Sequence, residues 1–336
     1  MSNAKNRNNG AANSNSNNEG GRIIMANGTI RTMEAFAETV KSAMEAVYGS
    51  GYDISIQPVT KNNGMHLTGL AIHEKIINIA PTIYLESLFE EYQGGMTMEA
   101  VCKEVMRLYE QSKAERGLDS RMVTDFNHAK ERICFKLVNA ERNRELLADI
   151  PSIPYHDLAV VFYILISKGA DGVGTVLVRN SFLDMWGADA QMLYPIAMEN
   201  TQRIFRGRVQ SVESVIVEMM EDIPDTGDSE EFYDMPAATE DVSPMYVASN
   251  QDRCNGASVL LYPDLLRDFA ECIGSDFFIL PSSVNELIFL PDTDGADIEY
   301  MKMVVQTING SGVAENEVLS DNVYFYSRAY DRVEMM

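Results

Sequence analysis

Two short apolar runs, Phe277–Leu280 and Leu287–Leu290, constrain the fold of this chain more than any other feature. Both consist of aromatic and branched aliphatic residues, which favour β-strands. Between them lies a polar insert, Pro281-Ser282-Ser283-Val284-Asn285-Glu286, with two hydroxyls, an amide and a carboxylate. A plain turn needs fewer polar groups. We therefore expect the insert to form a shaped surface between two strands.

The surrounding residues predict a C-terminal α+β lobe over residues 245–336. Strand-like and helical patterns alternate in the order β-β-α-β-β-α-β, which describes helices packed against a mainly antiparallel sheet. Pro263 marks a helix start, because the first helical turn does not use its missing N–H. The expected strands are 245–249, 257–262, 277–280, 287–290 and 322–327, and the expected helices are 263–273 and 297–309.

A tight hairpin organises the predicted N-terminal lobe, residues 25–120. Asn62-Asn63-Gly64 separates two alternating segments, Tyr52–Thr60 and Met65–His73. Asn-Gly supplies the positive φ angles that such a turn requires. A helix over 32–48, a third strand over 78–84 and helices over 85–92 and 98–113 complete the order α-β-β-β-α-α.

The predicted middle α/β lobe covers residues 121–221. Its clearest elements are two buried strands, 158–167 and 174–179, and two helices, 189–205 and 212–220. Phe126–Leu147 follows a helical pattern for the most part, although Ile133–Val138 fits a strand equally well.

Residues 222–244 are predicted to form an acidic linker between the middle and C-terminal lobes. From Glu218 to Asp241 ten acidic residues occur without one Lys or Arg. Self-repulsion and poor burial favour an exposed spacer. A docking surface for a basic partner is the alternative. The predicted fold class is thus α+β and multi-lobed, with mainly antiparallel sheets.

The formal net charge of −23 argues against several kinds of partner. Nucleic-acid backbones and acidic lipid surfaces repel such a chain, so we expect neither nucleic-acid nor membrane binding. A protein that imitates the charge of DNA would be the exception. The four cysteines and four histidines show no metal-ligand spacing. We expect a cytoplasmic protein with reduced thiols, no metal and no cofactor.

The N-terminal residues 1–24 have a composition unlike the rest of the chain. Eight of the first 18 residues are Asn, which predicts a disordered leader without a core-forming face. Glu19-Gly20-Gly21-Arg22 can be back-translated to a ribosome-binding sequence shortly before the Met25 codon. We therefore expect translation to start at Met25 rather than at Met1, which the intact mass of the native protein would test.

Four segments of the chain carry a resemblance to a known family: NIAPTIYLESLFEEYQGG (78–95), HDLAVVFYILI (156–166), NSFLDMWG (180–187) and LPSSVNELIFLPD (280–292). They resemble a bacterial family of unknown function, domain of unknown function number 5688. The C-terminal lobe also resembles a second bacterial family of unknown function, with a Pro-Ser-Ser-x-x-Glu pattern at residues 281–286. Many relatives have His in place of Asn285. The resemblance implies a fold grouping and no particular activity.

The insert contains the candidate catalytic residues Ser282, Ser283 and Glu286. A nucleophilic serine needs a base within hydrogen-bond reach, a group that orients the base, and oxyanion donors. A hydrolase using Ser283 and Glu286 would therefore need a distant histidine. The four candidates all lie more than 120 residues earlier: His66, His73, His128 and His156. Alternatively, the serines and Asn285 brace the backbone of a long hairpin, or they form a ligand-binding surface.

The polar loop Ser249–Gly256 is the second candidate region. In a compact sheet it could lie near the insert, which makes Asn250 a candidate co-ligand. The charged neighbours of Cys254, Asp252 and Arg253, roughly cancel, so we expect a structural rather than a nucleophilic thiol. His156-Asp157, just before a buried strand, is a further candidate dyad.

The chain contains no complete catalytic constellation. We therefore expect a non-enzymatic binding or regulatory protein that acts through protein–protein contacts. The expected surface comprises Pro281, the two serines, Asn285 and Glu286, with Asn250 beside them and the acidic linker as a secondary surface. The 20 methionines also favour adaptable contact surfaces. The alternatives are the hydrolase described above and an acidic DNA-mimic inhibitor.

Overall fold

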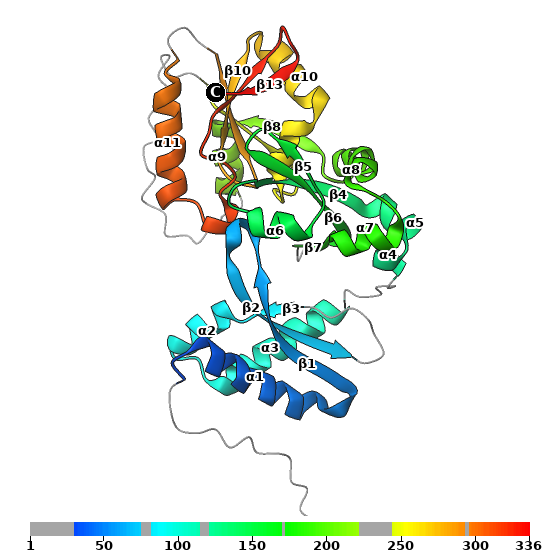
Figure 1. Cartoon of the computed structure of the whole chain (residues 1–336). Helices are drawn as coiled ribbons and strands as arrows, with labels where there is room; N and C mark the ends of the chain where they lie inside the picture. Colours follow the sequence, from blue (N-terminus) through cyan, green and yellow to red (C-terminus); the bar gives the residue numbers. More distant parts are fainter. Residues whose placement is uncertain (1–29, 75–81, 115–120, 170–171, 222–243, 293–295) are drawn as a thin grey trace, which may run out of the picture.

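The N-terminal lobe, residues 33–114, has the order of elements that the hydrophobic pattern predicts. The structure, a computed structural model, describes residues 30–74, 82–114, 121–169, 172–221, 244–292 and 296–336 (Figure 1). The predicted leader over 1–24 and the start of the third strand lie outside these residues. The elements are α1 (Met33–Tyr48), β1 (Tyr52–Thr60), β2 (His66–Glu74), β3 (Thr82–Tyr84), α2 (Glu86–Gln93) and α3 (Met98–Ala114).

The sheet β1-β2-β3 has one face packed on helices and one face turned away from them. Strand alternation places Ile54, Leu70 and Ile72 on the first face, where they are buried with Phe36 and Val40 of α1. The strand registers place Val59, Gly69 and Tyr84 on the second face.

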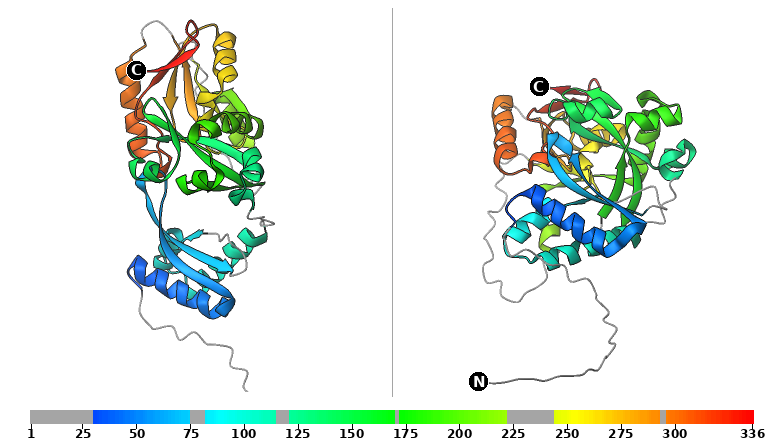
Figure 2. Two further views of the ribbon diagram at one scale, coloured as in Figure 1. Left: turned by 45° about the vertical axis from the view of Figure 1, so that its right-hand side comes forward. Right: turned by 60° about the horizontal axis from the view of Figure 1, so that its bottom comes forward.

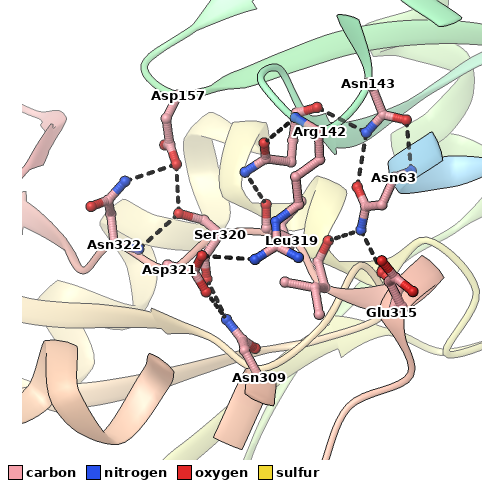
Figure 3. Close-up of polar contacts among 12 residues, drawn as sticks. Asn63, Arg142, Asn143, Asp157, Asn309, Glu315, Leu319, Ser320, Asp321 and Asn322 are labelled. Carbon is pink, nitrogen blue, oxygen red and sulfur yellow. Dashed lines mark hydrogen bonds and ion pairs between the residues drawn. The ribbon is translucent and has the colours of Figure 1, made fainter. Parts of the chain in front are cut away.

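The tip of the β1–β2 hairpin joins this lobe to the rest of the molecule (Figures 1 and 2). Asn63 has a φ of +59°, a left-handed conformation that Asn tolerates better than most residues. Its side-chain amide donates to the carbonyl oxygens of Glu315 and Val318, each at 2.7 Å (Figure 3). Its backbone N–H donates to Asn143 Oδ1 at 2.8 Å, and Asn143 Nδ2 donates back to Asn63 Oδ1 at 2.9 Å. This buried polar junction fixes the hairpin tip.

A four-stranded antiparallel sheet lies at the centre of the body, which comprises residues 121–221 and 244–336. Strand β6 (Leu158–Gly169) pairs with the other three strands, β4 (Ile133–Asn139), β5 (Ser152–Tyr155) and β7 (Gly172–Leu177). The helical interpretation of most of 126–147 is therefore wrong, and the strand alternative holds. Residues 133–139 form a strand because they pair with β6, and a local sequence pattern does not show this pairing. The helices of this part are α4 (Arg121–Thr124), α5 (Phe126–Ala129), α6 (Arg144–Asp149), α7 (Asn180–Trp186) and α8 (Ala190–Ile204).

A six-stranded antiparallel sheet unites the predicted middle and C-terminal lobes. Its order is β13-β12-β10-β11-β9-β8, and β8 and β9 pair although the acidic segment separates them in sequence. One hydrophobic core also includes residues of both lobes. The prediction places these two lobes apart, whereas in the structure they share a sheet and a core. Residues 222–243, the predicted acidic linker, lie outside the described part of the chain. The elements are β8 (Gly207–Ser211), α9 (Val212–Glu221), β9 (Tyr246–Asn250), β10 (Phe277–Pro281), β11 (Leu287–Pro291), β12 (Tyr324–Ser327) and β13 (Arg332–Met335).

The two C-terminal helices pack on opposite faces of the six-stranded sheet. Helix α10 (Pro263–Ile273) packs with Phe277 in the main core, whereas α11 (Ile298–Ser311) covers Phe278 on the other face. The α+β fold class is confirmed.

Two details of the C-terminal order differ from the prediction. The expected strand over 257–262 is a 3₁₀ helix, η4 (Gly256–Leu261), and β13 is an additional strand. Residues Ala257–Leu260 are buried, so their apolar composition alone does not distinguish a strand from a helix.

Candidate functional site

The Pro281–Glu286 insert is a compact turn whose polar groups bond to one another and to neighbouring segments. The backbone N–H groups of Ser282 and Ser283 both donate to the Glu286 carbonyl oxygen, at 3.3 and 3.1 Å. Ser283 Oγ accepts from Asn285 N at 3.0 Å, and Ser282 Oγ donates to Glu286 Oε1 at 3.2 Å. These contacts fit the alternative in which the serines and Asn285 brace the backbone of a hairpin.

The structure brings the insert and the 249–256 loop together. Ser249 Oγ donates to the Asn285 carbonyl oxygen at 2.6 Å, and Asn255 N donates to Asn285 Oδ1 at 3.0 Å. A Cβ added to Gly256 would lie 2.0 Å from Ser249 Oγ and 2.2 Å from the Asn285 carbonyl oxygen. Only glycine permits this close approach, so the two segments form one interlocked unit.

Asn250 is an internal brace of its loop. It is 2 % exposed, and its Oδ1 accepts from Asp252 N at 3.1 Å and from Cys254 N at 3.2 Å. Its Nδ2 donates to the Cys254 carbonyl oxygen at 2.8 Å. All of its contacts therefore serve the loop, which leaves little capacity for a ligand.

The described residues place no histidine in hydrogen-bond contact with Ser282 or Ser283. His66 contacts Thr60 and lies 4.0 Å from Glu145, and His128 contacts Asp125. His156 packs between the rings of Tyr155 and Tyr324. Among the described residues, the only side-chain carboxylate that contacts either serine is thus that of Glu286, which accepts from Ser282 Oγ, and neither serine contacts an imidazole.

Asp157 and Cys254, the other two candidate catalytic groups, also lie in surroundings that favour a structural role. Asp157 accepts hydrogen bonds from Ser320 and Asn322, at 2.6 and 3.0 Å (Figure 3). It also accepts one from Tyr324, at 2.5 Å, and so ties the β5–β6 turn to the start of β12. Burial raises the pKa of the Cys254 thiol, which disfavours the thiolate that a nucleophile needs. Within the described ranges, no group of three or more His, Cys, Asp or Glu is arranged to hold a metal ion.

The free edge of β8 is a second candidate site, which sequence reasoning missed. The hydrogen bond from Gln251 N to the Arg206 carbonyl oxygen, 3.0 Å long, sets the phase of the β8–β9 ladder. In that phase Gly207, Val209 and Ser211 direct their backbone groups away from β9. No described residue pairs with this side of β8.

An open groove of about 470 Å³ runs beside this edge. Side chains of α10 form much of its apolar surface, and acidic residues from the same helix flank it. Arg206, just before β8, also lines it. The sequence signal for the site is weak, because β8 is a five-residue strand between two helices. The lining residues are Gln202, Arg206, Gly207, Val209, Tyr262, Asp264, Leu265, Asp268 and Phe269.

Comparison with known proteins places the chain in a family. The model of the family of unknown function DUF5688 matches residues 33–328, so the chain belongs to this family. No curated protein and no solved structure matches the chain. The likeness of the C-terminal lobe to a second family stays a prediction. None of the described helices is long and apolar enough to cross a membrane.

Proposed function

We propose that this protein is a non-enzymatic binding protein that acts through protein–protein contacts at the β8 edge. The observation that carries the proposal is the row of outward backbone groups at Gly207, Val209 and Ser211 beside the open groove. An exposed strand edge is a template for a further strand. A partner segment in extended conformation would gain backbone hydrogen bonds there.

The groove specifies the chemistry of that segment. Tyr262, Leu265 and Phe269 offer an apolar surface for one side chain of the added strand. Asp264 and Asp268 add negative charge at the same place, in a chain of net charge −23. The partner is therefore an extended segment with a large apolar residue and a nearby Lys or Arg.

A peptide selection tests this proposal directly. Random peptides displayed on phage are selected on the wild-type protein, and their affinities are measured by fluorescence polarisation. The proposal predicts apolar and basic consensus peptides that lose binding to the Val209→Pro variant. Proline removes only an N–H that points away from β9, and edge strands tolerate it, so the fold should persist.

The control variant is Val217→Ala, because Val217 is an exposed apolar residue that does not line the groove. It should bind the selected peptides as the wild type does. A Leu265→Ala variant should weaken binding through loss of apolar contact. Peptides that bind Val209→Pro and Leu265→Ala with wild-type affinity, or a selection without enrichment, would contradict the proposal.

A further inference from the structure

A hollow of about 330 Å³ lies between the N-terminal lobe and the body. Its volume falls at the lower end of the range of about 300–1,000 Å³ that is typical of small-molecule sites. Residues of β1 and β3 form one wall, and α6 and the residue before α7 form the other. Helix α6 lies beside the hairpin, at the end of the body that faces the N-terminal lobe (Figure 1). The lining residues are Gln57, Pro58, Val59, Thr60, Thr82, Glu145, Leu146, Asp149 and Arg179.

The buried polar junction at the hairpin tip sets the position of the two walls. Asn143, which exchanges hydrogen bonds with Asn63, is the residue directly before α6. Asn63 in turn follows β1 closely in the turn of the hairpin. The β1 wall and the α6 wall therefore both begin near one buried contact. This contact fixes where the hollow lies between the two parts of the molecule.

The wall on the side of the N-terminal lobe depends on a glycine. A Cβ added to Gly69 would lie 2.4 Å from Thr82 Cγ2 and 3.0 Å from Val59 Cγ2. The absence of a side chain at Gly69 thus allows Thr82 and Val59 to lie over β2 from either side. Both residues line the hollow, so a larger residue at position 69 would displace part of its wall.

The wall on the side of the body holds an arginine and an aspartate next to each other. Asn180 Nδ2, at the start of α7, donates to the Ala148 carbonyl oxygen at 3.2 Å. This hydrogen bond joins the residues that neighbour Arg179 and Asp149 in sequence. Both charged side chains are exposed and line the hollow. Within the described ranges, neither side chain forms an ion pair or a hydrogen bond, so both remain available to a ligand.

A second carboxylate, that of Glu145, lies nearer to the hairpin. Its Oε2 is 4.0 Å from His66 Nε2, and His66 Nδ1 contacts Thr60 Oγ1 at 3.4 Å. The lining therefore carries two carboxylates and one guanidinium group, an excess of negative charge when His66 is neutral. Gln57 and the two threonine hydroxyls add uncharged polar groups.

We infer that this hollow binds a free α-amino acid with a cationic side chain. The carboxylate of the ligand pairs with Arg179 and its α-ammonium group with Asp149, because these opposite charges stand on one carbon atom in the ligand and border one small hollow in the protein. The cationic side chain of the ligand faces Glu145 and balances the remaining charge. An anionic ligand without a cation would leave both carboxylates of the lining uncompensated.

The site is separate from the β8 groove, because the two share no lining residue. Binding of an amino acid in the hollow and binding of a peptide at the β8 edge can therefore succeed or fail independently. L-lysine is a suitable probe, since it carries two ammonium groups and one carboxylate at pH 7.

Isothermal titration calorimetry of the full chain with L-lysine at pH 7 tests the site. The wild type should bind one L-lysine. Asp149→Asn and Arg179→Gln should each weaken binding about tenfold or more, because each removes a charge-assisted hydrogen bond. Both positions are exposed, so both variants should fold. The matched control is Asp184→Asn, an exposed carboxylate of α7 that does not line the hollow, and it should bind as the wild type does.

Ligand analogues test how the amino acid is recognised. Cadaverine, which lacks the carboxylate, and L-glutamate, which lacks the cationic side chain, should each bind about tenfold or more weakly than L-lysine. Equal affinity for cadaverine would overturn the pairing with Arg179, and equal affinity for L-glutamate would overturn the choice of a cationic side chain. No binding of L-lysine at about 10 mM, or wild-type affinity in either the Asp149 or the Arg179 variant, overturns the inference as a whole.

Discussion

The Pro281–Glu286 insert and Lys136 place polar groups in opposite ways. In the insert, the hydroxyl of Ser283 and the amide of Asn285 find partners within the turn or in the adjoining loop. Lys136 has no carboxylate partner among the described residues, although it emerges from an otherwise apolar face of the sheet.

A high density of polar residues is thus a poor guide to where a chain binds ligands. Polar groups that satisfy one another stabilise a local structure and have little left to offer a ligand. A desolvated charge without a partner has an unfavourable solvation energy. Removal of a polar group is therefore expected to lower stability in the insert and to raise it at Lys136.

The largest expected effect is that of Gly256→Ala on the interlocked unit. The new Cβ would overlap Ser249 Oγ and the Asn285 carbonyl oxygen, at 2.0 and 2.2 Å, so the two segments must separate. We expect the free energy of unfolding to fall by about 3 kcal/mol, measured by urea denaturation. Gly310→Ala is the control: it lies in α11 with no atom within 4 Å of the new Cβ, and should gain about 0.5–1 kcal/mol. A Gly256→Ala variant as stable as the wild type would show that the insert and the 249–256 loop are not tightly packed against each other.

A smaller effect of opposite sign is expected for Lys136→Met. Removing a desolvated and unpaired ammonium group should raise the free energy of unfolding by about 1–2 kcal/mol at pH 7. Lys103→Met, at an exposed position, should give no such gain. A loss of stability in Lys136→Met would mean that the ammonium group has a partner in the folded protein.

The gain in the free energy of unfolding that Lys136→Met produces should also depend on pH. Because the pKa of Lys136 is lowered from 10.5 in the folded chain, the folded state binds fewer protons than the unfolded state between the two pKa values. The wild type therefore gains stability as the pH rises through this window, and the advantage of Lys136→Met shrinks toward zero near 10.5. Denaturation series of both proteins from pH 7 to 10.5 measure the difference; a constant difference would contradict a lowered pKa.

The smallest effect is expected for Ser283→Ala. The variant loses one acceptor for Asn285 N, a partly buried hydrogen bond worth about 1 kcal/mol in the free energy of unfolding. A Ser283→Ala variant that is more stable than the wild type would contradict a bracing role of this hydroxyl and remove the contrast between the two regions.

The sequence predicts the elements whose signals are local. The β1–β2 hairpin follows from Asn62-Asn63-Gly64 between alternating segments, and β10 and β11 follow from two short apolar runs. Helix α10 begins at Pro263 as expected. In each case propensity, period and turn chemistry agree, and the tertiary structure retains the same element.

The remaining features depend on contacts that are distant in sequence. The pairing of β8 with β9 across the acidic segment joins two expected lobes, and Asn63 bonds to residues about 250 positions away. A single lysine within the apolar run Ile133-Cys134-Phe135-Lys136-Leu137-Val138-Asn139 is the one local signal for a charge on this sheet face. The sequence does not show that its neighbours on the face, Cys134, Val138 and Val161, are buried.

The most direct test of the contrast between the two regions is the titration of Lys136 itself, followed by NMR through its side-chain ¹³Cε resonance and assigned with the Lys136→Met variant. The midpoint should lie below the ordinary value of 10.5, because the buried surroundings disfavour the ammonium form. A midpoint at or above the ordinary value would contradict a desolvated and unpaired ammonium group.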